Sequence, residues 1–150
     1  MEKFKEEIPQ EITSQGIIDN LMPDKFEATK LLAERLGFDV VMGHDNLLLL
    51  DLDDKAARST FDHNLDVVKR IFGVEKIDAW VSKSGGDHQH VAVTLKQKAT
   101  ILERVAIQAA LGSDPIREIL TLVRLRNGVK EPSRLFRPKG VASEHSGPKL

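Results

Sequence analysis

A run of four leucines that ends in closely spaced acids constrains this chain more than any other feature of its sequence. Residues 47–50 are all leucine, and Asp51, Leu52, Asp53 and Asp54 follow them directly. A short apolar run bounded by polar residues predicts a buried β-strand. Side chains two residues apart project from the same face of a strand, so we expect Asp51 and Asp53 to point together at its end.

This acid pair has two interpretations. Two neighbouring carboxylates repel each other unless a positive charge compensates them, and hard divalent cations such as Mg²⁺ do this well. The pair would then belong to a metal site. Alternatively, Asp53 or Asp54 only caps the helix that follows the strand.

Hydrophobic periodicity predicts the other elements. One amphipathic helix is predicted by the spacing of Ala57, Phe61, Leu65, Val68 and Phe72, with Gly73 ending it. Further helices are expected over 24–36 (capped by Asp24), 98–111 (inward residues Ile101, Val105 and Ala109) and 114–126 (inward residues Ile116, Ile119, Leu120 and Val123). Strands are expected over 38–42, 77–82, 88–95 and 133–137.

From residue 47 onward, these elements follow the order β-α-β-β-α-β. This order predicts an α+β fold with a ferredoxin-like or RRM-like sheet and helices on one face. An α-β extension would precede the sheet. We expect a single domain over 1–139 with an N-terminal arm over 1–23, followed by a disordered tail over 140–150.

A turn rich in small residues joins the strands expected over 77–82 and 88–95 into a hairpin. Ser84, Gly85 and Gly86 would let backbone N–H groups approach a phosphate. His88 and His90 alternate with Gln89, so they share a face of the returning strand, which would be the carboxylate face if the strands are neighbours. The alternative is a polar hairpin end with histidines facing solvent.

A third acid would complete a metal site. Asp114 is one candidate, but an Asp followed by Pro115 is also a normal start of a helix. Glu118 is the other candidate. The sequence leaves both open.

The charge is unevenly distributed, although the formal net charge is only −1. Between residues 117 and 139 there are seven basic and two acidic side chains. The basic ones are Arg117, Arg124, Arg126, Lys130, Arg134, Arg137 and Lys139. Such a stretch is typical of triphosphate or nucleic-acid backbone binding, or else forms a solvated face.

In combination, these features resemble the archaeo-eukaryotic primase superfamily, which includes the primase-polymerases. The resemblance covers residues 38–139. Its strand-borne acid pair is matched by Asp51 and Asp53, and its small-residue turn before a histidine by Ser84, Gly85 and His90. Its later acid and basic strand are matched by Asp114 and by the segment 134–139.

The resemblance implies a primase-like catalytic core that makes short oligonucleotides from nucleoside triphosphates on a single-stranded DNA template. Two Mg²⁺ or Mn²⁺ ions would be held by Asp51, Asp53 and Asp114, with His90 as a further catalytic residue. A replicative helicase would be a further partner. The nucleotide-binding residues would be Lys83, Ser84, Gly85, His88, His90, Arg134, Arg137 and Lys139.

Composition excludes several other classes. The chain has no cysteine and therefore no cysteine-based zinc module, so no zinc is expected. It has no tyrosine, which the HUH endonucleases need for their covalent intermediate. No apolar run approaches the ~18 residues of a membrane span, so we expect a cytoplasmic protein without a membrane partner. Two alternatives are a non-catalytic primase-like module that binds single-stranded nucleic acid or a replication partner, and a ferredoxin-like interaction module.

Overall fold

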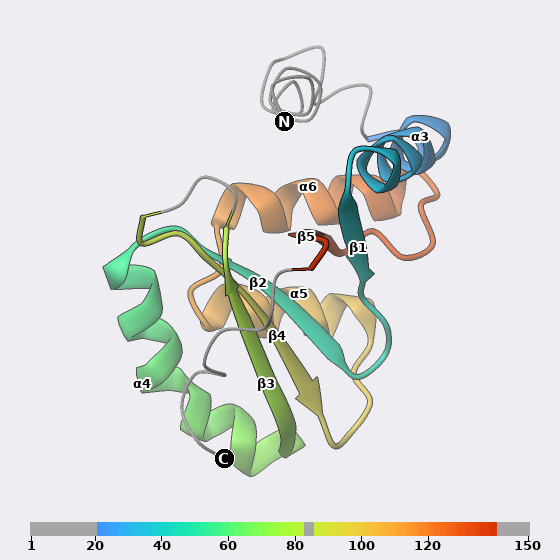
Figure 1. The fold of residues 1–150 in the computed structure, drawn as a ribbon. Helices are drawn as coiled ribbons and strands as arrows, with labels where there is room; N and C mark the ends of the chain where they lie inside the picture. Colours follow the sequence, from blue (N-terminus) through green and yellow to red (C-terminus); the bar gives the residue numbers. More distant parts are fainter. Residues whose placement is uncertain (1–20, 83–85, 141–150) are drawn as a thin grey trace.

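The computed structural model describes residues 21–82 and 86–140, which form an α+β fold with two antiparallel sheets (Figure 1). The helices are α3 (Pro23–Arg35), α4 (Lys55–Phe72), α5 (Ile101–Ala110) and α6 (Pro115–Arg126). The strands are β1 (Phe38–Met42), β2 (Leu47–Leu52), β3 (Val74–Val81), β4 (Gln89–Leu95) and β5 (Arg134–Pro138). Most of the predicted arm and tail lie outside the described residues.

The central sheet has three strands in the order β2-β4-β3. β4 lies between β2 and β3 and is antiparallel to both, which is the strand order expected of a split β-α-β unit. The last strand differs from the expectation of one continuous ferredoxin-like sheet. β5 pairs with β1 instead, in a separate two-stranded ribbon with Val40 opposite Phe136.

The two faces of the central sheet are covered by different layers. On one face, Leu48, Leu50 and Leu52 pack with residues of α4 such as Phe61 and Leu65. On the other face, the residues that alternate with them pack against the β1-β5 ribbon, in a cluster of Leu49, Trp80, Ala92 and Leu135. The ribbon therefore covers the sheet face that also carries Asp51, since Asp51 is two residues from Leu49.

The predicted helix α4 is confirmed, while the starts of two other helices differ from prediction. Asp54 caps α4, and Gly73 ends it. The cap of α3 is Met22 rather than Asp24, because Pro23 takes the first helical position. α5 starts at Ile101, three residues later than predicted, because Thr100 and Glu103 form a reciprocal capping box there.

The outer edge of β2, away from β4, is closed by groups from α5 and α6. The backbone N–H of Leu49 donates to Gln108 Oε1 at 3.0 Å, and that of Asp51 donates to Ser113 Oγ at 3.0 Å. The carbonyl of Leu49 accepts from Arg117, and that of Asp51 accepts from the backbone N–H of Asp114. These four bonds satisfy backbone groups that a neighbouring strand would otherwise satisfy, so β5 is not needed at this edge.

This role of α6 overturns part of its predicted inward face, of which only Leu120 and Val123 are half-buried. Glu118, Thr121 and Arg124 are its buried residues, whereas Ile116 and Ile119 are 64% and 58% exposed. α5 likewise buries Arg104, Val105 and Gln108 and leaves Ala109 exposed. Periodicity located both helices, but the polar groups needed at the edge of β2 decide which side of α6 faces inward.

Gly112 sets how α6 follows α5. Its φ is +93°, which favours glycine, and a Cβ atom there would lie 2.6 Å from the carbonyl oxygen of Ala57 in α4. The tight turn brings Ser113 and Asp114 directly beside the end of β2. Within the described part of the chain, no helix is both long and apolar enough to cross a bilayer.

Candidate functional site

The strand register brings the predicted acids and histidines to one place. Asp51 lies directly opposite His90, and His90 lies opposite Trp80, so these three residues form a row across the sheet. His88 precedes His90 by two residues and therefore lies on the same side. The expectation that the histidines share the face of the carboxylates is confirmed.

Direct contacts join these side chains. His88 Nε2 is in hydrogen-bond contact with Asp51 Oδ1 and lies 2.9 Å from Asp53 Oδ1. His90 Nε2 lies 3.5 Å from Asp51 Oδ1. Asp54 caps α4 by accepting from Ala57 N–H at 2.8 Å, so the cap does not use Asp53, which contacts His88.

Asp114 performs two roles at this position. Its carboxylate caps α6 by accepting from Ile116 N–H at 3.0 Å, as the capping interpretation predicts. A carboxylate oxygen of Asp114 nevertheless lies within 4.8 Å of oxygens of Asp51 and Asp53. We refer to Asp51, Asp53 and Asp114 as the acid triad.

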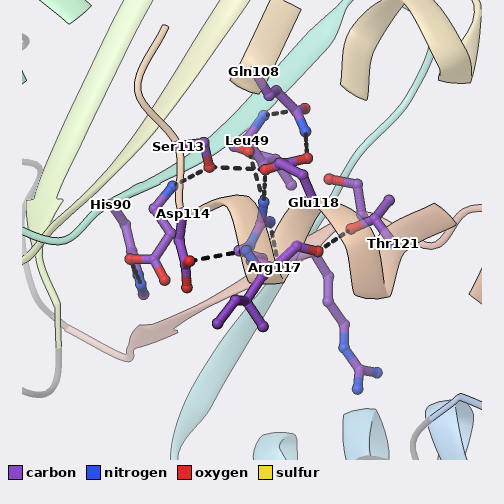
Figure 2. A network of polar contacts seen from close by, with 12 residues as sticks. Leu49, His90, Gln108, Ser113, Asp114, Arg117, Glu118 and Thr121 are labelled. Carbon is purple, nitrogen blue, oxygen red and sulfur yellow. Dashed lines mark hydrogen bonds and ion pairs between the residues drawn. The ribbon is translucent and has the colours of Figure 1, made fainter. Parts of the chain in front are cut away.

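Glu118, the other candidate for the third acid, is directed elsewhere. It is 3% exposed, and its carboxylate accepts hydrogen bonds from Gln108, Ser113 and Arg117 (Figure 2). Burial raises the pKa of Glu118, and these three partners oppose that effect. With its oxygens occupied, Glu118 supports the edge of β2, and the geometry favours Asp114 as the third acid.

The electrostatics of the acid triad and of His90 follow from burial and crowding. Desolvation by burial raises the pKa of Asp53, and repulsion from Asp51 and Asp114 raises it further, while His88 opposes the shift. Burial lowers the pKa of His90 to about 4, against the attraction of Asp51. The imidazole of His90 is therefore neutral at pH 7 and does not compensate the carboxylates.

Arginines line a cavity next to the acid triad. The cavity has a volume of about 240 Å³, and its lining includes Asp51, His90 and Asp114 together with Arg117, Arg124 and Arg134. Carboxylates and guanidinium groups thus border the same small space, an arrangement suited to a phosphate bound through a metal ion.

Two of the arginines predicted to bind the nucleotide, Arg134 and Arg137, make contacts within the protein instead. Arg134 is 7% exposed, donates to the carbonyl of Phe26, and lies 3.6 Å from the centre of the Phe26 ring. Arg137 lies 3.7 Å from Asp78 and stacks over Trp80 at 5.0 Å. Lys139, by contrast, is exposed.

Three predicted nucleotide-binding residues, Lys83, Ser84 and Gly85, lie outside the described residues. The sequence did not predict two residues that support the site. Ser113 and Gln108 accept hydrogen bonds from the backbone of β2, and neither has a sequence signal of its own. A search for polar residues at the spacing of a buried helix face could have found Gln108. A search for apolar periodicity cannot find it.

Comparisons of the chain with protein-family models, with curated proteins and with solved structures found no match.

Proposed function

We propose that this protein is a metal-dependent nucleotidyltransferase of the primase-polymerase type, which makes short oligonucleotides on single-stranded DNA. The observation that carries the proposal is the convergence of Asp51, Asp53 and Asp114 within 4.8 Å of one another, beside a cavity lined by arginines. The three acids come from the end of β2 and the start of α6, which are far apart in sequence.

The chemistry of the acid triad fits a divalent cation. Burial and repulsion from Asp51 and Asp114 raise the pKa of Asp53, so the charged form of this carboxylate is destabilised. Mg²⁺ and Mn²⁺ bind carboxylate oxygens and would remove that repulsion. Two such ions would activate a 3′-hydroxyl and stabilise the leaving pyrophosphate.

The protein's own residues would bind and orient the nucleotide. Asp51 is held rigidly, because its backbone N–H and carbonyl are both hydrogen-bonded to the segment that begins α6. Arg117 and Arg124 line the cavity and would attract the phosphates. His90 lines the same cavity and would border the bound nucleotide.

Exposed cations near the end of the chain would hold the template. Arg126, Lys130 and Lys139 are exposed. Their charges would bind the phosphate backbone, with an affinity that falls steeply as salt rises.

A second candidate function is a primase-like module that binds single-stranded nucleic acid without catalysis. It is favoured by the capping bond of Asp114, which occupies one of the carboxylate oxygens that a metal ion would need. The two functions differ in whether the acid triad is required.

A synthesis assay distinguishes them. The full chain, with Mn²⁺ or Mg²⁺, a single-stranded DNA template and labelled nucleotides, should yield short oligonucleotides. The double variant Asp51→Ala/Asp53→Ala should yield none, while Asp66→Ala, which removes an exposed carboxylate paired with Arg70 on α4, should retain the wild-type yield. Equal yields from the wild type and the double variant would exclude the catalytic proposal.

A further inference from the structure

Two histidines make this site chemically different from one built of carboxylates alone. His88, His90 and Asp51 each offer one ligand atom, and these three atoms lie within 4.8 Å of one another. This group shares Asp51 with the acid triad but otherwise uses different residues. We refer to it as the histidine site.

We infer that the histidine site binds one Zn²⁺, Co²⁺ or Fe²⁺ ion, separately from the Mg²⁺ or Mn²⁺ at the acid triad. The inference deepens the proposed function and rests on it in one respect, since Asp51 would bridge the two ions. Two imidazoles and a carboxylate are a common ligand set for Zn²⁺, Co²⁺ and Fe²⁺. Mg²⁺, by contrast, prefers oxygen ligands.

The distances are close to those of a bound ion. Ligand atoms about 2.1 Å from a tetrahedral metal lie roughly 3.4 Å from each other. The separation of His90 Nε2 and Asp51 Oδ1 is 3.5 Å. His88 and Asp51 are closer, in hydrogen-bond contact. An ion bound by both side chains would hold these two atoms farther apart.

The surroundings of His90 hold its ring in place for such a role. The ring lies edge-on to Trp80, with 5.9 Å between the ring centres, and nearly perpendicular to the ring of His88. Within the described part of the chain, His90 Nδ1 is buried without a hydrogen-bond partner, so the ring is positioned by these packing contacts.

Asp51 is equally well fixed. Ser113 and Asp114 hold its backbone from the side of α6, and β4 borders β2 from the other side. The side chain of Asp51 is 16% exposed and that of His88 is 26% exposed, so an ion could reach the site from solvent. The histidine site is therefore both supported and accessible.

Titration with Co²⁺ alone tests the inference without any nucleotide or template. Co²⁺ bound by imidazole nitrogens has a visible absorption spectrum that changes with its ligands. The wild-type chain should bind Co²⁺ with such a spectrum, and excess Mg²⁺ should not displace it. His88→Ala should weaken binding by more than about 100-fold, because even outer-shell changes cost about 10- to 100-fold.

Matched variants separate this site from the rest of the molecule. His63→Ala, which removes an exposed histidine of α4, should leave Co²⁺ affinity unchanged. Asp114→Asn alters only the acid triad and should also leave it unchanged. If His88→Ala shows no thermal unfolding transition, His90→Gln takes its place.

The inference is wrong if the histidine variants keep wild-type Co²⁺ affinity, or if excess Mg²⁺ displaces Co²⁺. Neither result depends on oligonucleotide synthesis, because the titration measures metal binding only. A chain that binds Co²⁺ through His88 but synthesises nothing would therefore refute the proposed function and leave the histidine site standing.

Discussion

Helices α4 and α6 have similar amphipathic sequences but bury opposite kinds of residue. α4 buries Phe61, Leu65 and Val68 against the face of the central sheet. α6 buries Glu118, Thr121 and Arg124, and it exposes isoleucines instead. The difference follows from what each helix covers.

A sheet face and a strand edge make different demands on the helix that covers them. The face of the sheet presents apolar side chains, so α4 gains stability by burying apolar area. The edge of β2 presents backbone N–H and carbonyl groups. Burying these groups without hydrogen-bond partners destabilises the folded state. α6, the segment before it and Gln108 of α5 supply those partners, and the same segment carries Asp114 to the acid triad.

The largest effects are expected where either helix loses its buried anchor. Phe61→Ala should lower the free energy of unfolding by about 3 to 5 kcal/mol, as truncation of a core aromatic residue does. Glu118→Ala should cost a comparable amount, about 3 to 5 kcal/mol, because it leaves the Arg117 guanidinium without its carboxylate. Chemical denaturation of the two variants measures both.

Glu118→Gln is the matched control for the second effect, because it keeps an acceptor oxygen for Ser113 while removing the charge. It should cost less than Glu118→Ala. Ordinary surface substitutions change the free energy of unfolding by no more than about 0.5 kcal/mol. If Glu118→Ala has an effect this small, the hydrogen-bonded edge of β2 is not what anchors α6.

A much smaller effect is expected on the outer side of α6. Ile119 is 58% exposed, so Ile119→Gln should change the free energy of unfolding by no more than about 0.5 kcal/mol. The helix predicted from periodicity alone would have this residue in the core. A loss of several kcal/mol, similar to that of Phe61→Ala, would therefore contradict the contrast between the two helices.

The sequence was sufficient for the parts of the fold governed by local pattern. The leucine run, the spacing of Phe61 and Leu65 in α4, and the alternation of His88 with His90 each follow from the period of a strand or helix. The pairing of β5 with β1 was not predictable in this way. It depends on the edge of β2 being closed by side chains from residues 108–117, about 60 positions away.

In the candidate site, too, local sequence pattern predicted some features and long-range packing determined the others. Period-two alternation predicted that Asp51 and Asp53 would share a face, and that His88 and His90 would do so on the next strand. The choice between Asp114 and Glu118 depended on which side of α6 faces β2. The stacking of Arg134 on Phe26 depended on the packing of α3, which its sequence does not specify.

Metal-dependent stabilisation of Asp114→Asn tests the central claim most directly. Asparagine caps a helix about as well as aspartate, so the variant keeps the cap while removing the carboxylate charge. Without metal, its melting temperature should equal or exceed that of the wild type, since repulsion within the acid triad is relieved.

With Mn²⁺ at 100 times its dissociation constant from the acid triad, the wild type should gain about 2.7 kcal/mol, or roughly 5 to 10 °C in melting temperature. Asp114→Asn should lose most of this gain and should synthesise no oligonucleotides. If Asp114→Asn keeps both the full Mn²⁺-dependent shift and wild-type synthesis, Asp114 is only a helix cap and the acid triad is not the metal site.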